Sequence, residues 1–235
     1  MTWLAPFLLF APTLFDQSVV RILQRNFPSA QFLLIDIDSR EIIGARWWDS
    51  DRPIPLGSLT KPFLLTQRDD KTSCSPQQCW LPQGHGRIDY IEAIAQSCNS
   101  YFLQKVTGKV RYLDPPPSPT PEILIGLGTQ WPISPIIIAR AYATLARDPE
   151  ATTTRAAMRA AARRGTAKLL GIDALAKTGT APCRHKHKAP TDGYIAVLYP
   201  PETPKYVLLV QVHGVSGATA AKTAGAMLIV LRDGK

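Results

Sequence analysis

The sequence has no internal repeat, no low-complexity tract and no apolar run long enough to cross a bilayer. Its 21 prolines are scattered among apolar stretches, which excludes a coiled coil and predicts that most of the chain is ordered. The apolar opening at residues 3–15 is shorter than the about 20 residues of a membrane-spanning helix. No Lys or Arg precedes it, and no clear small-residue cleavage site follows. Three interpretations stay open: a degenerate export signal, a start codon placed too late, or a first buried segment.

Length and composition predict one domain. The chain has 235 residues, 45% of them hydrophobic, which is enough to bury one substantial core. We expect residues 1–15 to form an apolar N-terminal segment and residues 16–235 to form a single domain.

Acidic residues are few, because 18 Asp and Glu stand against 27 Lys and Arg, for a net charge of +9. This charge suits nucleic acid, a membrane surface or an acidic wall polymer and does not choose among them. The basic clusters are Arg155, Arg159, Arg163 and Arg164, spaced as one face of an Ala-rich helix, and the Arg-His-Lys-His-Lys run at residues 184–188. We predict that both clusters are solvated, because Lys and Arg side chains are normally exposed.

Cysteines are also few, namely Cys74, Cys79, Cys98 and Cys183. An even number permits disulfides in an exported protein, and Cys74 with Cys79 is the favoured pair. Cys98 is predicted to remain a packed thiol. Cys74 and Cys79, with His85 nearby, also resemble half of a zinc site, but the CxxC-type spacing and a second ligand pair are missing. The sequence therefore assigns no metal ligand and no cofactor.

Hydrophobic spacing predicts a helix at each end of the chain. Residues 14–26 carry apolar side chains at helical spacing and stop before Pro28, and residues 216–231 form an Ala-rich closing helix. Residues 31–37 and 42–48 are β-rich runs joined by turn residues, which indicates an antiparallel hairpin.

The middle of the chain is predicted to be mainly helical. A helix begins near residues 57–65, and a second pattern at residues 88–106 is interrupted at residues 97–100 by residues that prefer turns and caps. Ser134 is placed to cap a third helix, with Pro135 at its first position.

Three late strands at residues 174–178, 193–198 and 206–212 complete the pattern. Together with the early hairpin they predict an α/β fold of the α+β type. Its antiparallel sheet of about five strands is flanked by the N- and C-terminal helices, with a second, mainly helical lobe. The seam between the two lobes is where a concave site is expected.

Ser58 and Lys61 are three residues apart, so on a helix their side chains share a face. A helix N-terminus and burial both favour the neutral amine of a lysine, which then accepts a proton from the serine hydroxyl. Ser97 and Asn99 in the interrupted helix supply a second hydroxyl and an amide that can hold a substrate carbonyl. Each pair occurs close to chance level alone.

Lys177, Thr178, Gly179 and Thr180 form a rarer motif at the end of a predicted strand. The glycine permits the close approach of a substrate backbone, and the hydroxyls and ammonium can receive a carboxylate. The order S-x-x-K, S-x-N and K-T-G, on these elements, is the pattern of penicillin-binding proteins and serine β-lactamases.

Longer segments strengthen this resemblance, which covers about residues 32–231. Pro-Leu-Gly-Ser-Leu-Thr-Lys-Pro-Phe at residues 55–63 resembles the nucleophile segment of peptidoglycan transpeptidases, and Ser-Cys-Asn-Ser-Tyr-Phe at residues 97–102 resembles their second motif. The intervals at residues 58–97 and 99–177 are short for that family, so inserted lobe elements are expected to be missing.

The resemblance implies a role for each matching position. Ser58 is acylated, Lys61 is the general base, Ser97 relays a proton, Asn99 orients the donor peptide and Lys177 supports the relay electrostatically. Their expected fold is the β-lactamase/transpeptidase fold.

The third motif and the backbone are implied to bind substrate. Thr178, Gly179 and Thr180 are the substrate-binding residues, with the two hydroxyls on the terminal carboxylate of a D-Ala-D-Ala stem peptide or a penicillin. The backbone N–H groups of Ser58 and Thr180 are implied to form the oxyanion hole.

The expected function is a penicillin-binding D,D-transpeptidase that acts on peptidoglycan stem peptides in the cell envelope. A D,D-carboxypeptidase, a serine β-lactamase and a non-catalytic wall-peptide or β-lactam sensor are the alternatives. The expected partners are stem peptides, β-lactams and a possible envelope protein, without nucleic acid.

A β-lactamase of class A type adds a glutamate in E-x-x-L-N. Glu92, Glu122 and Glu150 are the acidic candidates, and none has Asn four residues later. A class D type enzyme uses a carbamylated lysine, for which Lys61 is the candidate.

The tryptophans are predicted to be packing anchors rather than a sugar platform. These are Trp47, Trp48, Trp80 and Trp131.

Overall fold

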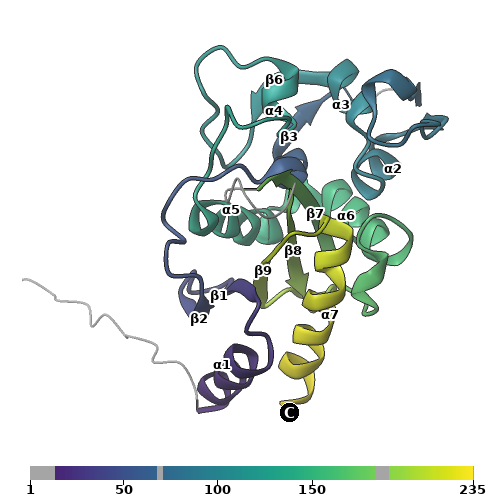
Figure 1. Cartoon of the computed structure of the whole chain (residues 1–235). Coiled ribbons are helices and arrows are strands. Elements are labelled where there is room, and N and C mark those ends of the chain that lie inside the picture. Colours follow the sequence, from purple (N-terminus) through teal and green to yellow (C-terminus); the bar gives the residue numbers. More distant parts are fainter. Residues whose placement is uncertain (1–13, 68–70, 184–190, 235) are drawn as a thin grey trace, which may run out of the picture.

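The computed structural model describes residues 14–67, 71–183 and 191–234 (Figure 1). The predictions for the apolar opening before residue 14 and for the basic run at residues 184–188 lie outside the described residues. In the described part of the chain, no helix has both the length and the apolar character that crossing a membrane requires.

Five antiparallel strands form the central sheet, in the order β2-β1-β9-β8-β7. β1 (Ala30–Asp36) and β2 (Ile42–Arg46) come from the start of the chain. β7 (Leu175–Pro182), β8 (Thr191–Tyr199) and β9 (Tyr206–His213) come from its end. The two groups join where β1 pairs with β9 along its whole length. This confirms the predicted five-stranded sheet assembled from both chain ends and leaves β7 at one edge.

Helices cover both faces of the sheet, as Figure 1 shows. α1 (Leu14–Asn26) and α7 (Gly217–Asp233) pack on one face, and α5 (Pro135–Arg147) packs on the other. The alternation of a strand explains both contacts, because Phe32 of β1 belongs to the core under α1 and α7, whereas the next residue, Leu33, belongs to the core under α5. Both side chains are fully buried.

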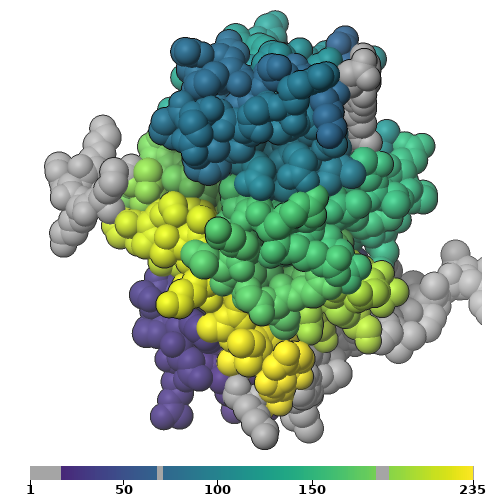
Figure 2. Space-filling model, turned by 90° about the vertical axis from the view of Figure 1, so that its right-hand side faces the viewer, coloured from purple at the N-terminus to yellow at the C-terminus, as the bar shows by residue number. Residues whose placement is uncertain are grey.

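The second lobe lies above the sheet in Figure 1 and connects β2 to α5. It is not purely helical, because two small two-stranded sheets, β3–β6 and β4–β5, accompany its helices. In Figure 2 this lobe, dark blue to teal, caps the face formed by α7 in yellow and the α6 region in green. Its elements are η1 (Gly57–Phe63), β3 (Leu64–Thr66), β4 (Thr72–Ser73), η2 (Pro76–Gln78), β5 (Arg87–Ile88), α2 (Tyr90–Ala95), α3 (Asn99–Lys105), β6 (Val106–Val110) and α4 (Pro121–Leu124). After α5 follow η3 (Pro149–Ala151), α6 (Thr152–Arg164) and η4 (Lys168–Leu170).

The segment that carries Ser58 is a 3₁₀ helix rather than the start of an α-helix. Pro62 has no backbone N–H to continue an α-helical ladder, and the chain turns into β3 at Leu64. Residues three apart eclipse each other in a 3₁₀ helix, so Ser58 and Lys61 still share a face, as predicted.

Three of the four arginines of α6 form ion pairs with acids of the same chain. Arg159 and Arg163 both pair with Asp173, and Arg164 pairs with Glu92. All three guanidinium side chains are partly exposed. The predicted solvated face is confirmed for Arg163 and Arg164. It is wrong for Arg159, whose side chain is 29% exposed, and for Arg155, which is half-buried and donates to the carbonyl oxygen of Leu145.

Candidate active site

A cleft of about 400 Å³ opens between the end of β7 and the second lobe. It therefore lies at the predicted seam. The residues that line it are Ser58, Trp80, Ser97, Asn99, Gly126, Leu127, Thr166, Thr178, Thr180, Ser216 and Ala218.

Two glycines let the start of η1 lie directly on β7. Gly57 has a φ of +58°, and a Cβ atom there would meet the carbonyl oxygen of Thr180 at 2.3 Å. A Cβ atom on Gly179 would meet the carbonyl oxygen of Leu56 at 2.4 Å. No side chain fits at either distance, so this close approach places Ser58 beside the K-T-G strand. The sequence predicted that Gly179 lets a substrate backbone approach. In the structure the space beside Gly179 is filled by the chain at Leu56, so the glycine is needed for packing.

Lys61 is fully buried and connects η1 to the break between α2 and α3. Its Nζ donates to the carbonyl oxygen of Ser97 at 2.8 Å and to Oδ1 of Asn99 at 2.6 Å. Nζ also lies 5.5 Å from the ring centroid of Phe102. Burial lowers the pKa of Lys61 from 10.5 to about 7, so a neutral amine is populated at neutral pH.

Ser97 lies in the break between α2 and α3, with a φ of +54°. This left-handed conformation is strained for a residue other than glycine and turns the chain between the two helices. Cys98 then caps α3, because its Sγ accepts the backbone N–H of Tyr101 at 3.4 Å. The predicted interruption of the helix is confirmed, and it presents Ser97 and Asn99 to the cleft.

Lys177 reaches Ser97 from β7 of the central sheet. Its Nζ donates to Oγ of Ser97 at 2.8 Å, while Nζ of Lys61 lies 3.4 Å from the same oxygen. Lys177 is also fully buried, and burial together with repulsion from Lys61 lowers its pKa well below 10.5. One serine hydroxyl thus bridges two buried amines, which is an arrangement suited to proton transfer.

The two threonines of the K-T-G-T motif line the cleft from β7. Oγ1 of Thr178 lies 2.6 Å from Oγ1 of Thr166, and Oγ1 of Thr180 accepts the backbone N–H of Gly217 at 2.9 Å. Gly217 is the first residue of α7, after the capping residue Ser216. The strand and the start of α7 therefore form one polar wall of the cleft.

Trp80 was assigned to packing from the sequence, but its side chain is 52% exposed and lines the cleft. Its Nε1 donates to the carbonyl oxygen of Gln96 at 3.0 Å, which fixes it beside the end of α2. Trp47 and Trp131 are buried as predicted, whereas Trp48 is 87% exposed. No local pattern around Trp80 distinguishes it from a buried tryptophan.

The four cysteines are free thiols, so the predicted disulfide between Cys74 and Cys79 is absent, while Cys98 is a thiol as expected. Cys74, Cys79 and Cys98 meet with His85 in one cluster whose donor atoms all lie within 4.8 Å of one another. From the sequence, Cys74, Cys79 and His85 were weighed as half of a zinc site, whereas Cys98 was predicted only to pack as a thiol.

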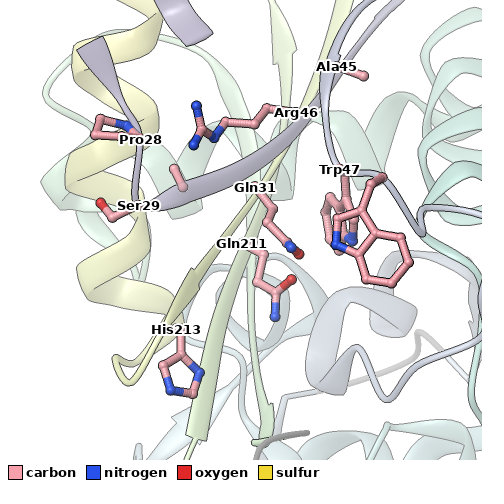
Figure 3. Close-up of a pocket in the computed structure, with 10 residues that line it drawn as sticks. Pro28, Ser29, Gln31, Ala45, Arg46, Trp47, Gln211 and His213 are labelled. Carbon is pink, nitrogen blue, oxygen red and sulfur yellow. The ribbon is translucent and has the colours of Figure 1, made fainter. Parts of the chain in front are cut away.

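A second hollow, of about 600 Å³, lies at the β1–β9 part of the sheet and is drawn in Figure 3. Gln31 and Gln211 are register partners there, and their side chains lie next to each other. Asp192 is buried and accepts from Nε2 of Gln211 at 3.0 Å. The hollow shares no lining residue with the cleft and contains none of the predicted site residues.

Solved structures of similar fold cover almost the whole chain. The D,D-transpeptidase domain of a peptidoglycan glycosyltransferase from Eggerthella lenta has a TM-score of 0.71 at 13% identity, over 92% of this chain and 81% of that one. Penicillin-binding protein PBP2 from Helicobacter pylori has a TM-score of 0.75 at 15% identity, over 93% of this chain and 63% of that one. A transpeptidase domain from Legionella pneumophila has a TM-score of 0.65 at 17% identity, over 93% and 96%.

No protein-family model matches the sequence, and the search of curated proteins finds no significant match. The likeness is thus one of structure, and the arrangement of sheet, flanking helices and second lobe carries it. The resemblance predicted from the motifs is confirmed for the fold: the chain has the fold of the transpeptidase domains of penicillin-binding proteins.

Proposed function

We propose that the chain is a D,D-transpeptidase-type serine acyltransferase that acts on D-Ala-D-Ala stem peptides and is acylated by penicillins at Ser58. The observation that carries the proposal is the contact of two buried amines with Ser97. Nζ of Lys61 and Nζ of Lys177 lie 3.4 and 2.8 Å from its Oγ, and Ser97 lines the same cleft as Ser58.

In the proposed reaction Oγ of Ser58 attacks the carbonyl carbon between the two D-Ala residues, and neutral Lys61 takes the hydroxyl proton. The backbone N–H groups of Ser58 and Thr180 stabilise the oxyanion. The C–N bond then breaks: Ser97 gives its hydroxyl proton to the leaving D-Ala nitrogen and takes the proton held by Lys61, which becomes neutral again. An amine of a second stem, or water, releases the acyl group from Ser58.

Asn99 and the K-T-G-T threonines are proposed to hold the substrate. The amide of Asn99, already bonded through Oδ1 to Lys61, orients the donor peptide with its nitrogen. The hydroxyls of Thr178 and Thr180 receive the terminal carboxylate, as their position on the cleft wall supports. With penicillin the same attack opens the lactam ring, and the leaving group stays attached to the acyl-enzyme.

The burial of Lys61 keeps a class D type β-lactamase as a second candidate, because carbamylation requires a neutral amine in an apolar pocket. A class A type activity has less support. Glu92 and Glu150 form ion pairs with Arg164 and Arg111, and none of the three candidate glutamates is among the described residues that line the cleft. A D,D-carboxypeptidase uses the same acyl-enzyme with water as the acceptor.

A location in the cell envelope and a protein partner are part of the proposal. The similar structures include PBP2 of Helicobacter pylori in complex with MreC, at 16% identity, and a peptidoglycan synthase complex. The chain spans 62% and 59% of those two proteins, so other regions of such proteins are outside this likeness.

Labelling with a fluorescent penicillin tests the proposal, with the modified peptide identified by mass spectrometry. We expect a single adduct on Ser58. Ser58→Ala should fold normally and remain unlabelled, whereas Ser18→Ala, which changes an exposed serine of α1, should label like the parent. An adduct on another residue, or unchanged labelling of Ser58→Ala, would contradict the proposal.

A further inference from the structure

The cysteine–histidine cluster lies in the second lobe beside the cleft and draws its four side chains from separate turns of the chain. Cys74 follows β4, Cys79 ends η2, His85 precedes β5, and Cys98 caps α3. Their donor atoms all lie within 4.8 Å of one another. Four such donors meet although the sequence separates the first from the last by a turn-rich segment and a helix.

The distances within the cluster match tetrahedral coordination. Zn–S bonds of about 2.3 Å and Zn–N bonds of about 2.0 Å place two sulfurs about 3.8 Å apart and a sulfur about 3.5 Å from the nitrogen. Cys98 Sγ lies 3.4 Å from Cys74 Sγ and 3.8 Å from Cys79 Sγ. Nδ1 of His85 lies 3.6 and 3.3 Å from Sγ of Cys74 and Cys79. A disulfide needs about 2.05 Å between sulfurs, so the cluster has the spacing of metal ligands instead.

The donor set selects the metal. Three thiols and one imidazole are soft and borderline ligands, which favour Zn²⁺ over Mg²⁺ or Ca²⁺. Four protein donors fill a tetrahedral shell, which is typical of structural zinc rather than of a catalytic site with an open position. Nε2 of His85 is buried without a hydrogen-bond partner among the described residues, so the polar contacts of this ring lie on the cluster side.

The segment around the cluster needs such a support, because it has almost no apolar core. Of residues 72–88, only Cys74, Gly84 and Ile88 are buried. Short segments of this kind are usually stabilised by a disulfide or a metal. Both Cys74 and Cys98 are buried, so the cluster lies at the base of the segment, where it joins α3.

We propose that Cys74, Cys79, His85 and Cys98 bind one structural Zn²⁺ ion and that this ion positions Ser97 and Asn99 beside Lys61. Three thiols lose their protons on binding and the imidazole stays neutral, which leaves the site with one net negative charge. The site does not depend on the proposed acyl transfer.

Cys98 connects the ion to the cleft, because it stands between Ser97 and Asn99 in the chain. Ser97 holds a strained φ of +54°, and a metal-bound neighbour fixes that turn. The next residue after Cys79 is Trp80, whose ring lies 5.5 Å from that of His85 and which lines the cleft. The ion therefore stabilises one wall of the cleft and the hydroxyl that both amines contact.

Metal analysis of the purified full-length chain tests the site. We expect one zinc per chain by elemental mass spectrometry, and after exchange with Co²⁺ the intense visible absorption of a tetrahedral thiolate site. Cys79→Ser should lose both signals. Cys183→Ser is the matched control and should keep both signals. Cys183 lies apart from the four proposed ligands, in a separate group with Asp192 and His213.

Penicillin labelling measures the effect on the cleft. Removing zinc with a chelator should slow labelling by roughly tenfold to a hundredfold, since displacements of about 1 Å at a reacting group have that effect. Re-addition of Zn²⁺ should restore the rate. If Ser58 is not acylated at all, the zinc content and the Co²⁺ spectrum still decide whether the site exists.

Two results would overturn the metal site. One is a chain purified under reducing conditions with Zn²⁺ present that holds no metal and gives no thiolate spectrum with Co²⁺. The other is an intact mass lower by two hydrogen atoms with Cys74, Cys79 or Cys98 in a disulfide. If Cys79→Ser does not fold, the Co²⁺ spectrum of the parent chain remains the deciding measurement. Unchanged labelling after complete zinc removal would overturn the positioning role.

Discussion

The apolar middle of the central sheet and the second-lobe wall of the cleft bury different kinds of side chain. Ile195 and Val197 of β8 are fully buried, as are Leu33 of β1 and Leu209 of β9, and all of them are apolar. The sheet also buries polar residues, namely Lys177 and Thr178 on β7, Asp192 on β8 and Gln211 on β9. In the wall of the cleft, the fully or almost fully buried residues include Lys61, Ser97 and Ser100. Apolar burial stabilises a fold, whereas polar burial costs free energy unless each group is paired. The apolar middle of the sheet therefore supplies stability, and the polar groups at the cleft, including Lys177 of β7, cost part of it.

Replacing Lys61 in the cleft wall should have the largest effect, and on rate alone. In Lys61→Met the proposed proton acceptor for Ser58 is lost, so acylation by penicillin should slow by about 10²- to 10⁴-fold. The melting temperature should stay within a few degrees of the parent, because an apolar side chain replaces a buried amine. Lys109→Met, at an exposed position, is the control. If Lys61→Met unfolded easily but its folded molecules were acylated at the parental rate, Lys61 would contribute to stability and not to the reaction.

Shortening a side chain in the core of the sheet should lower stability and leave the acylation rate unchanged. Leu209 of β9 is fully buried in the core under α5, so Leu209→Ala should lower the free energy of unfolding by about 2–5 kcal/mol. The folded fraction should still acylate at the parental rate. Denaturant unfolding and a penicillin rate corrected for folded protein measure both. Lys205→Ala, at an exposed position beside β9, should change stability by about 0.5 kcal/mol or less.

The pH dependence of acylation tests the role of Lys61 in the cleft. Burial lowers the pKa of Lys61 to about 7, so the protonated amine dominates below that pH and cannot accept a proton. Acylation should therefore rise with pH, about tenfold per unit below pH 7, and level off above it. The lowered folded-state pKa also makes stability increase as pH rises from about 7 toward 10.5. A rate that is flat from pH 5 to 8 would exclude Lys61 as the base.

The smallest effect is expected outside both regions, on the surface of α6. Arg163 pairs with Asp173 while its side chain is 56% exposed, so Arg163→Ala should change stability by about 0–1 kcal/mol and leave acylation unchanged. The difference should shrink in high salt. A larger loss in denaturant unfolding would mean that this face contributes to the fold.

Local sequence patterns were sufficient for the sheet. β8 and β9 are continuous apolar, β-branched runs, and the hairpin of β1 and β2 has its turn residues between them, so neighbours along the chain carry the signal. The break at Ser97 was also predictable, because Ser, Cys and Asn favour caps and turns. The 3₁₀ form of η1 was missed, although Pro62 inside the segment was a visible sign of it.

Contacts between distant segments were not predictable from such patterns. His85 and Cys98 meet only because α2 lies between them and brings its end back to the η2 loop, and no local spacing encodes this. The close approach of Leu56 to Gly179 likewise depends on how η1 lies on β7. Trp80 looks like a core residue in the sequence and becomes part of the cleft only through the same folding of the lobe.

The central claim is that Ser58 forms a stable acyl-enzyme in a cleft whose two buried amines share Ser97. Intact-mass measurement over time, with penicillin in excess and with or without bicarbonate, tests it most directly. We predict one penicillin added per chain, absent in Ser58→Ala, and an adduct that persists for minutes or longer because no deacylating glutamate lines the described cleft. Sustained hydrolysis above about one turnover per second would contradict the transpeptidase-type account and identify a β-lactamase.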